Sequence, residues 1–219
     1  RPDMVNTRKR ATVLFKVTLS LTALCLGLWF GLNIDSKPSA SPPTANGAVF
    51  KSPRPLTALT LHDHLGASFD LRRLADHWNF LYLGYAHCPD LCPTTLAALS
   101  VAKRALTRES PQFPIQFVFV SVDPDRDTPE RLKNYVAFFD SSLIGVTGTP
   151  DNLKALSRQF GASYRLPKDR GKGYAVDHTD VILIVSPEPA FAAVLTPPHD
   201  GTRIAEDFRR VVAWNETND

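Results

Sequence analysis

The sequence of 219 residues contains few methionines, cysteines and glycines, and each shortage excludes a class of protein. Met4 is the only methionine, so the chain beyond it offers no thioether sulfur as a metal ligand. Three cysteines are too few for the disulfide framework of a small secreted scaffold. There is no Gly-rich phosphate loop, Ser-centred nucleophile elbow or internal repeat. With 43% hydrophobic and 21% charged residues, the chain is expected to fold into one globular domain.

An evenly spread positive charge is also missing. Five basic side chains and one acidic side chain fall in the first sixteen residues, and this segment accounts for the whole formal charge of +3. A nucleic-acid-binding domain is expected to spread Lys and Arg over one face of its fold. We therefore expect no nucleic-acid partner.

A long apolar run follows the basic cluster at residues 8–10. Residues 17–34 contain no charged side chain, and as a helix they would extend about 27 Å, close to the thickness of a bilayer core. The stem of Lys16 can reach back toward lipid headgroups and lengthen the span. A cleaved signal peptide with its cleavage site at residues 39–41 is the alternative. We favour an uncleaved transmembrane helix in which Cys25 is an ordinary apolar residue.

The predicted organisation has three parts. Residues 1–34 form a cytoplasmic tip and membrane anchor, because the positive flank of a membrane helix stays in the cytoplasm. Residues 35–55 contain five prolines and four serines, and we expect them to form an extended, solvated linker. Residues 56–219 form the exported domain. In a Gram-negative cell, this organisation predicts a single-pass protein of the inner membrane with its C-terminal domain in the periplasm.

Apolar runs of strand length alternate with helical patterns in the exported domain. The expected strands are residues 79–85, 115–122, 143–146, 181–185 and 191–195. The expected helices run from about 92 to 108, after the Thr-Pro pairs at 128–129 and 149–150, and near the C-terminus. Gly161 is placed to end the third of these helices. This order predicts an α/β fold whose mixed sheet carries helices on both faces, with sites at the carboxyl ends of its strands.

The segment from Cys88 to Cys92 (CPDLC) lies where the first central strand ends and a helix begins. Residues four apart in a helical turn place their side chains on one side, so the two sulfurs can form a disulfide or bind one metal ion. A helix N-terminus favours the thiolate, so we expect at least one of the two thiols to have a lowered pKa. The alternative, two inert core cysteines, fits a polar, proline-bounded turn poorly.

Two thiolates leave a metal ion short of ligands, and six histidines are candidates for a third. His178 is favoured because it comes shortly before the strand at 181–185, in a loop at one end of the sheet. His87 adjoins Cys88, but at a strand end it points to the face opposite its neighbour, which favours an orienting or surface role. Solvated surface positions are expected for the other four, His62, His64, His77 and His199.

Three motifs resemble those of the Sco/SenC family of membrane-anchored copper chaperones. They are Gly84 to Leu96 (GYAHCPDLCPTTL), Val120 to Pro129 (VSVDPDRDTP) and Val176 to Thr179 (VDHT). The resemblance extends from about residue 56 to residue 214. The sequence departs from the family pattern at Ala86, where a hydroxyl residue is common, and at His199.

The resemblance implies a thioredoxin-like fold and one copper ion, Cu(I) or Cu(II), held by Cys88, Cys92 and His178. Soft thiolates select Cu(I), and a mixed sulfur and imidazole set also tolerates Cu(II). The resemblance also implies that the protein is a chaperone and not an enzyme. Such a chaperone receives copper from a periplasmic donor and delivers it to the CuA centre of cytochrome c oxidase subunit II. Asp123 has a family counterpart near the metal loop, although capping the turn that follows it is an equally good interpretation.

Two other functions compete with this one. A thiol-disulfide oxidoreductase would use Cys88 and Cys92 to reduce client cysteines before metal insertion. Thiol exchange does not need His178, so the presence of this residue favours the chaperone. A peroxidase of peroxiredoxin type would need one low-pKa thiol beside a Thr and an Arg, and no such set is evident around Cys88.

Overall fold

The computed structural model describes the chain except residues 1–15, 17, 30–40, 109–113, 172 and 219. Pro42–Asp219 form one compact unit, and the helical residues 18–29 belong to a separate unit. Among the described residues, no helix has both the length and the apolar character needed to cross a membrane. Most of the anchor expected at residues 1–34 lies outside the described residues.

A mixed eight-stranded sheet forms the centre of the compact unit, with the strand order β1-β10-β9-β4-β5-β6-β2-β3. Strands β4, β5 and β6 are parallel, and the strands outside them are antiparallel to their neighbours. A separate antiparallel pair is formed by β7 and β8. The strands are β1 (Gly47–Pro55), β2 (Leu61–Asp63), β3 (Ser68–Phe69), β4 (Trp78–Gly84), β5 (Ile115–Ser121), β6 (Ile144–Thr147), β7 (Tyr164–Arg165), β8 (Asp177–His178), β9 (Ile182–Val185) and β10 (Ala190–Leu195).

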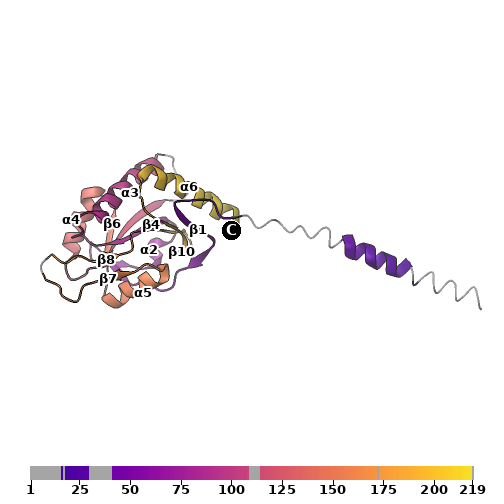
Figure 1. The fold of residues 1–219 in the computed structure, drawn as a ribbon, viewed down its shortest axis with the longest axis horizontal. Coiled ribbons are helices and arrows are strands. Elements are labelled where there is room, and N and C mark those ends of the chain that lie inside the picture. Colours follow the sequence, from indigo (N-terminus) through magenta and orange to yellow (C-terminus); the bar gives the residue numbers. More distant parts are fainter. Residues whose placement is uncertain (1–15, 17, 30–40, 109–113, 172, 219) are drawn as a thin grey trace, which may run out of the picture. The chain divides into compact units, whose positions relative to one another are not determined.

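Helices cover both faces of this sheet, as the alternating pattern predicts (Figure 1). Phe208 of α6 packs on Phe80 of β4, with ring centroids 4.8 Å apart, and α3 lies against α6. On the opposite face, Phe160 of α5 packs on Phe191 of β10. The helices are α2 (Leu71–Leu74), α3 (Leu91–Thr107), α4 (Pro129–Phe139), α5 (Pro150–Phe160) and α6 (Gly201–Asn218).

Local sequence explains where α4 and α5 begin and where α5 ends. The side chains of Thr128 and Thr149 accept hydrogen bonds from the backbone N–H groups of Arg131 and Asn152, and a proline follows each threonine. Gly161 ends α5 in the left-handed conformation, with φ of 65°. These three expectations are confirmed.

The core is richest around β4, in which every residue is buried. A parallel strand covered on both faces carries a continuous apolar run rather than an alternating one. Phe80 of β4 stacks on Phe117 of β5, with centroids 4.6 Å apart. Each such side chain contributes about 1.5–3 kcal/mol when it is fully buried. The rigid end of β4 leads directly into the cysteine segment.

Residues 47–55 require a correction, because they form the edge strand β1 rather than part of the expected linker at 35–55. Backbone pairing with β10 holds this strand, and the Phe50 ring packs edge-on to Phe191 with centroids 4.7 Å apart. Its prolines, Pro53 and Pro55, are tolerated because an edge strand needs fewer N–H donors. No side chain of this strand is fully buried, so the sequence shows no apolar strand pattern there.

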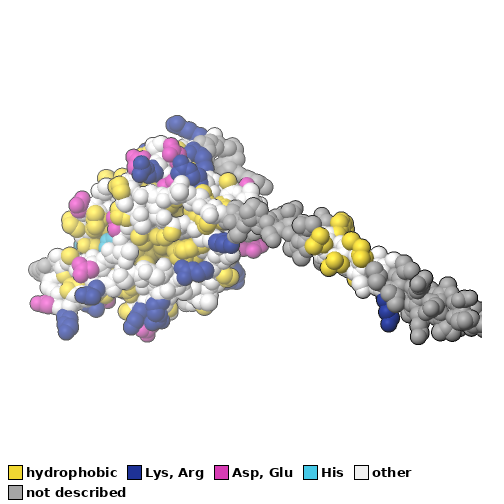
Figure 2. Space-filling view, turned by 45° about the vertical axis from the view of Figure 1, so that its right-hand side comes forward, with side chains coloured by type: hydrophobic (Ala, Val, Ile, Leu, Met, Phe, Trp, Pro, Cys, Tyr) yellow, Lys and Arg dark blue, Asp and Glu magenta, His cyan; other side chains and the backbone are white. Residues whose placement is uncertain are grey.

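The surface of the compact unit carries charges of both signs. On the face shown in Figure 2, basic and acidic side chains are interspersed, and no area of that face is covered by basic side chains alone.

Candidate metal centre

The two motif cysteines lie at the carboxyl end of β4, where the chain turns into α3. The Cys88 N–H donates to the Tyr85 carbonyl at 3.1 Å, which closes this turn. The Cys92 N–H then donates to the Cys88 sulfur at 3.4 Å. Cys92 lies in the first turn of α3 and is fully buried, whereas Cys88 is half-buried. One sulfur is therefore anchored in the core, and the other is reachable from solvent.

His178 completes the group from the opposite side. It lies in β8, where it pairs with Tyr164 of β7. Its Nε2 is 3.4 Å from the Cys92 sulfur. The two sulfurs and one ring nitrogen of His178 all lie within 4.8 Å of one another. The structure thus brings together the three residues that the sequence analysis selected as metal ligands.

Burial sets the protonation of two members of this group. It raises the pKa of the Cys92 thiol, and the neighbouring Cys88 adds to this effect. The expected thiolate-favouring effect of the helix N-terminus is therefore outweighed at Cys92 by loss of solvation. Burial also lowers the pKa of His178, which keeps its imidazole neutral near pH 7. A neutral imidazole retains a lone pair with which it can bind a metal.

Two tyrosines flank the His178 ring. Tyr82 and Tyr85 both meet it edge-on, with centroids 6.1 and 6.0 Å away. Burial raises the pKa of Tyr82 well above its ordinary value, so its hydroxyl stays protonated and donates to Asp180 at 3.0 Å. Burial opposes ionisation of Asp180, but contacts with His199 and Tyr82 outweigh it and lower the pKa of this carboxyl group.

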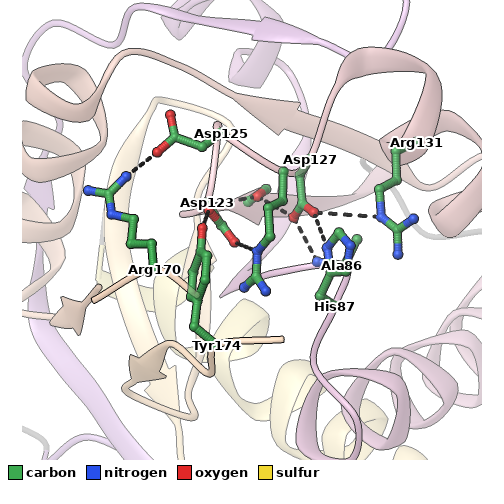
Figure 3. A network of polar contacts seen from close by, with 10 residues as sticks. Ala86, His87, Asp123, Asp125, Asp127, Arg131, Arg170 and Tyr174 are labelled. Atoms are coloured by element: carbon green, nitrogen blue, oxygen red, sulfur yellow. Dashed lines mark hydrogen bonds and ion pairs between the residues drawn. The ribbon is translucent and has the colours of Figure 1, made fainter. Parts of the chain in front are cut away.

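The buried carboxylate of Asp127 holds Ala86 and His87, the two residues that precede Cys88 (Figure 3). One oxygen accepts hydrogen bonds from the Ala86 N–H at 2.7 Å and from the Ser121 hydroxyl at 2.6 Å. The other oxygen lies 3.2 Å from Nδ1 of His87. His87 therefore has an orienting contact with Asp127, and it is not one of the three residues whose ligand atoms converge.

A second carboxylate ties down the segment that precedes His178. Asp123 is fully buried and accepts from the Tyr174 hydroxyl at 2.6 Å and from Nε of Arg126 at 2.5 Å. The Arg126 guanidinium in turn lies 3.4 Å from the centroid of the Tyr174 ring. Arg170 pairs with Asp125 nearby (Figure 3). The backbone carbonyl of Asp123, rather than its carboxylate, accepts from the N–H groups of Arg126 and Asp127 and closes the turn that follows it.

The remaining histidines differ from the expectation of solvated positions. His62, His64 and His77 are half-buried. His199 is the clearest correction, because its side chain is only 4% exposed and its Nε2 lies 3.4 Å from Asp180. Its polar sequence neighbours suggested a solvated loop, whereas the chain after β10 folds back against the sheet.

Sequence reasoning missed several residues that support the site. Asp127 lies in a motif that was recognised, but its role depends on the buried N–H of Ala86, which no sequence pattern reveals. Asp180 was also missed, although it lies only two residues after His178 in the sequence. Gly84 was also missed, and an added Cβ there would lie 2.8 Å from the Cys92 sulfur. A glycine at the end of a buried strand, four residues before Cys88, was the available signal for this close approach.

The comparisons with known proteins agree with this geometry. The sequence profile of SCO1/SenC matches residues 54–213. The chain belongs to the SCO1/SenC family. It is 35% identical over 150 residues to the mitochondrial SCO2 homolog of Danio rerio, covering 68% of this chain and 54% of that one. It is 30% identical over 218 residues to mitochondrial SCO2 of Saccharomyces cerevisiae, covering 96% and 71%. The chain thus spans little more than half the length of the first of these relatives.

The solved structure of Arabidopsis thaliana ScoI with copper bound has the same fold. It is 31% identical to this chain, covers 77% of this chain and 99% of its own, and superposes with a TM-score of 0.65. The architecture is therefore the mixed α/β, thioredoxin-like fold of the Sco proteins, as the motif resemblance implied.

Proposed function

We propose that this Sco protein is a copper metallochaperone that carries one copper ion on Cys88, Cys92 and His178. The observation that carries the proposal is the convergence of two sulfurs and one imidazole nitrogen within 4.8 Å. The relative with copper bound supports copper as the cargo.

The donor chemistry fits this cargo. Thiolates are soft ligands that select Cu(I), and an imidazole in the set extends the site to Cu(II). Three protein ligands leave a position for a ligand of an incoming partner, which release of a cargo requires. The half-buried Cys88 is the reachable side of the group, so we expect transfer to begin there.

The test is an anaerobic copper titration of the protein, read from sulfur-to-copper charge-transfer absorption. We expect one copper ion per chain in the wild type and none in Cys88→Ala or Cys92→Ala, because one thiolate and one imidazole cannot close the site. His62→Ala is a matched control and should keep full binding, since His62 lies in β2 at the far side of the sheet. Stoichiometric copper in either cysteine variant would refute the ligand assignment.

A thiol-disulfide oxidoreductase is the second candidate, favoured by the close approach of one reachable sulfur and one buried sulfur. The Cys88 thiolate would attack a client disulfide, forming a mixed disulfide and releasing one client thiolate. The Cys92 thiolate would then attack the Cys88 sulfur and release the second client thiolate. Two electrons pass to the client, and the pair is left as a disulfide.

His178→Ala separates the two candidates. It removes the imidazole and leaves both thiols, so we expect loss of Cu(II) binding and of the charge-transfer band, with the Cys88–Cys92 disulfide still able to form. Oxidase activity in cells should fall and be partly restored by added copper. Normal oxidase assembly in this variant at ordinary copper supply would instead support the oxidoreductase.

We further propose that the client is subunit II of cytochrome c oxidase, at its CuA centre, and that copper comes from a periplasmic donor. Residues 1–34 would anchor the chain in the inner membrane, with the C-terminal domain in the periplasm. An anchor raises the local concentration of the domain near a membrane-embedded client. Anchored and anchor-free proteins should therefore differ in oxidase assembly at equal abundance, and equal assembly would refute the anchoring role.

A further inference from the structure

His199 is a buried histidine that the proposed function does not use. Its side chain is 4% exposed, and neither ring nitrogen makes a hydrogen bond of good geometry with the described residues. Its Nε2 nevertheless lies 3.4 Å from Oδ1 of Asp180. Loss of solvation without a partner costs free energy. Asp180 is the nearest acidic partner of this ring, and a small rotation turns an Nε2–H toward its carboxylate.

Asp180 is a junction between the elements that carry the proposed ligands. Its Oδ1 accepts from the Tyr82 hydroxyl at 3.0 Å, and it is also contacted by the Thr95 hydroxyl at 3.5 Å and by Nε2 of His199 at 3.4 Å. Tyr82 lies in β4, which leads to Cys88, and Thr95 lies in α3, which begins beside Cys92. Asp180 itself follows β8 by two residues. One carboxylate oxygen thus joins all three ligand-bearing segments.

The orientation of His178 depends on its packing. Its Nδ1 is 3.4 Å from the Thr179 carbonyl, which is long for a hydrogen bond. The ring of Tyr82 meets it edge-on at an interplanar angle of 81°. Because the Tyr82 hydroxyl donates to Asp180, that carboxylate restrains the flanking ring in addition to the core packing around it.

We propose that Asp180 and His199 are positioning residues of the metal site. His199 restrains the carboxylate, the carboxylate holds Tyr82, and the Tyr82 ring keeps His178 oriented toward the cysteines. The inference deepens the proposed function, since it takes His178 as a ligand. Residues that orient metal ligands typically change metal affinity by about 10–100-fold when they are replaced.

The test compares two replacements of His199 in the full chain. His199→Leu removes the contact with Asp180, whereas His199→Gln keeps a side-chain N–H donor. We expect Cu(II) affinity, measured by competition with a chelator, to fall about 10–100-fold in His199→Leu and to stay within about threefold of wild type in His199→Gln. His62→Leu is the matched control and should bind as wild type.

A purely structural role makes a different prediction. It would lower the urea midpoint of the metal-free protein in His199→Leu and leave the copper affinity of the folded protein unchanged, and that result would overturn the proposal. Tyr82→Phe removes the hydroxyl that Asp180 holds, so it should weaken copper binding similarly, and the double variant with His199→Leu should show no further loss. If His199→Leu does not fold, wild-type affinity in Tyr82→Phe would overturn the proposal.

A metal-free readout separates this inference from the proposed function. The ring-proton NMR shifts of His178 report the flanking aromatic rings, and we expect them to move in His199→Leu and Tyr82→Phe and to stay in place in His62→Leu. Failure of the wild type to bind copper would refute the proposed function and leave this comparison intact. Unchanged His178 shifts in both variants would refute the positioning role even if the wild type binds copper.

Discussion

Gly84→Ala is the substitution that tests the packing of the metal centre most directly. Gly84 ends β4 and faces α3, and a Cβ there would lie 2.8 Å from the Cys92 sulfur and 2.9 Å from the Phe119 ring. Atoms in contact pack best at about 3.5–4.0 Å, so the two separations must open by about 1 Å, shared between these neighbours and the strand. Phe119 is wedged against Tyr82 and Tyr135. The new methyl group is therefore expected to push away from Phe119, and the Cys92 sulfur is the neighbour that we expect to move furthest.

Two effects of different size follow from this displacement. Overpacking of a well-filled core costs about 1–3 kcal/mol of folding free energy. A movement of about 1 Å also exceeds the roughly 0.5 Å within which a functional constellation must be held. We therefore expect copper affinity to fall by at least about tenfold in Gly84→Ala, while the protein still folds.

The assays are urea unfolding of the metal-free protein and copper titration of the folded protein. Gly145→Ala is the matched control, because a Cβ at this strand glycine would lie 3.1 Å from Val136 of α4, away from the cysteines. It should lose stability and keep copper affinity. Wild-type affinity in Gly84→Ala would refute the reasoning that this glycine makes room for the Cys92 sulfur.

Three further outcomes are expected. In the metal-free protein, the free energy of unfolding measured in urea should decrease as pH falls below about 6.5, because folding lowers the pKa of His178. It should also decrease as pH rises above about 9, because folding raises the pKa of Cys92. A free energy of unfolding that does not change with pH would contradict both pKa shifts. Asp127→Ala should lower the free energy of unfolding by about 1–3 kcal/mol for each buried donor left unpaired, and an unchanged urea midpoint would exclude this. A chain starting at Pro42 should keep the wild-type urea midpoint. A chain starting at Leu56 lacks β1, so its free energy of unfolding should fall by about 2 kcal/mol or more, and it should associate through the exposed edge of β10. Equal urea midpoints for the two chains, both monomeric, would show that β1 is dispensable.

Local patterns in the sequence were sufficient for most of the fold. The buried strand at β4 and the helix starts at Thr128 and Thr149 depend on residues close in sequence, and the structure agrees with them. The strand β1 was missed because its stability comes from pairing with β10, more than 130 residues away. A strand with few buried side chains leaves no periodic pattern to detect.

The three proposed metal ligands could also be predicted from local sequence patterns. Cys88 and Cys92 are neighbours in sequence, and His178 precedes a recognisable strand, so the ends of adjacent strands bring them to the same edge of the sheet. The supporting residues could not be anticipated in this way. His199 looks like a surface residue in its own segment, and only the folded chain brings it to Asp180.

At Cys92, the effect of the helix N-terminus on the thiol pKa is outweighed by burial. A helix N-terminus does favour a thiolate, and the sequence placed a cysteine there, but Cys92 is fully buried and its pKa is raised. A metal ion bound at this sulfur must therefore displace its proton. If the proposed ligand set is correct, copper affinity should rise with pH and binding should release protons, which calorimetry in buffers of different ionisation enthalpy can count. Binding without proton release near pH 7 would mean that the Cys92 sulfur is not a ligand.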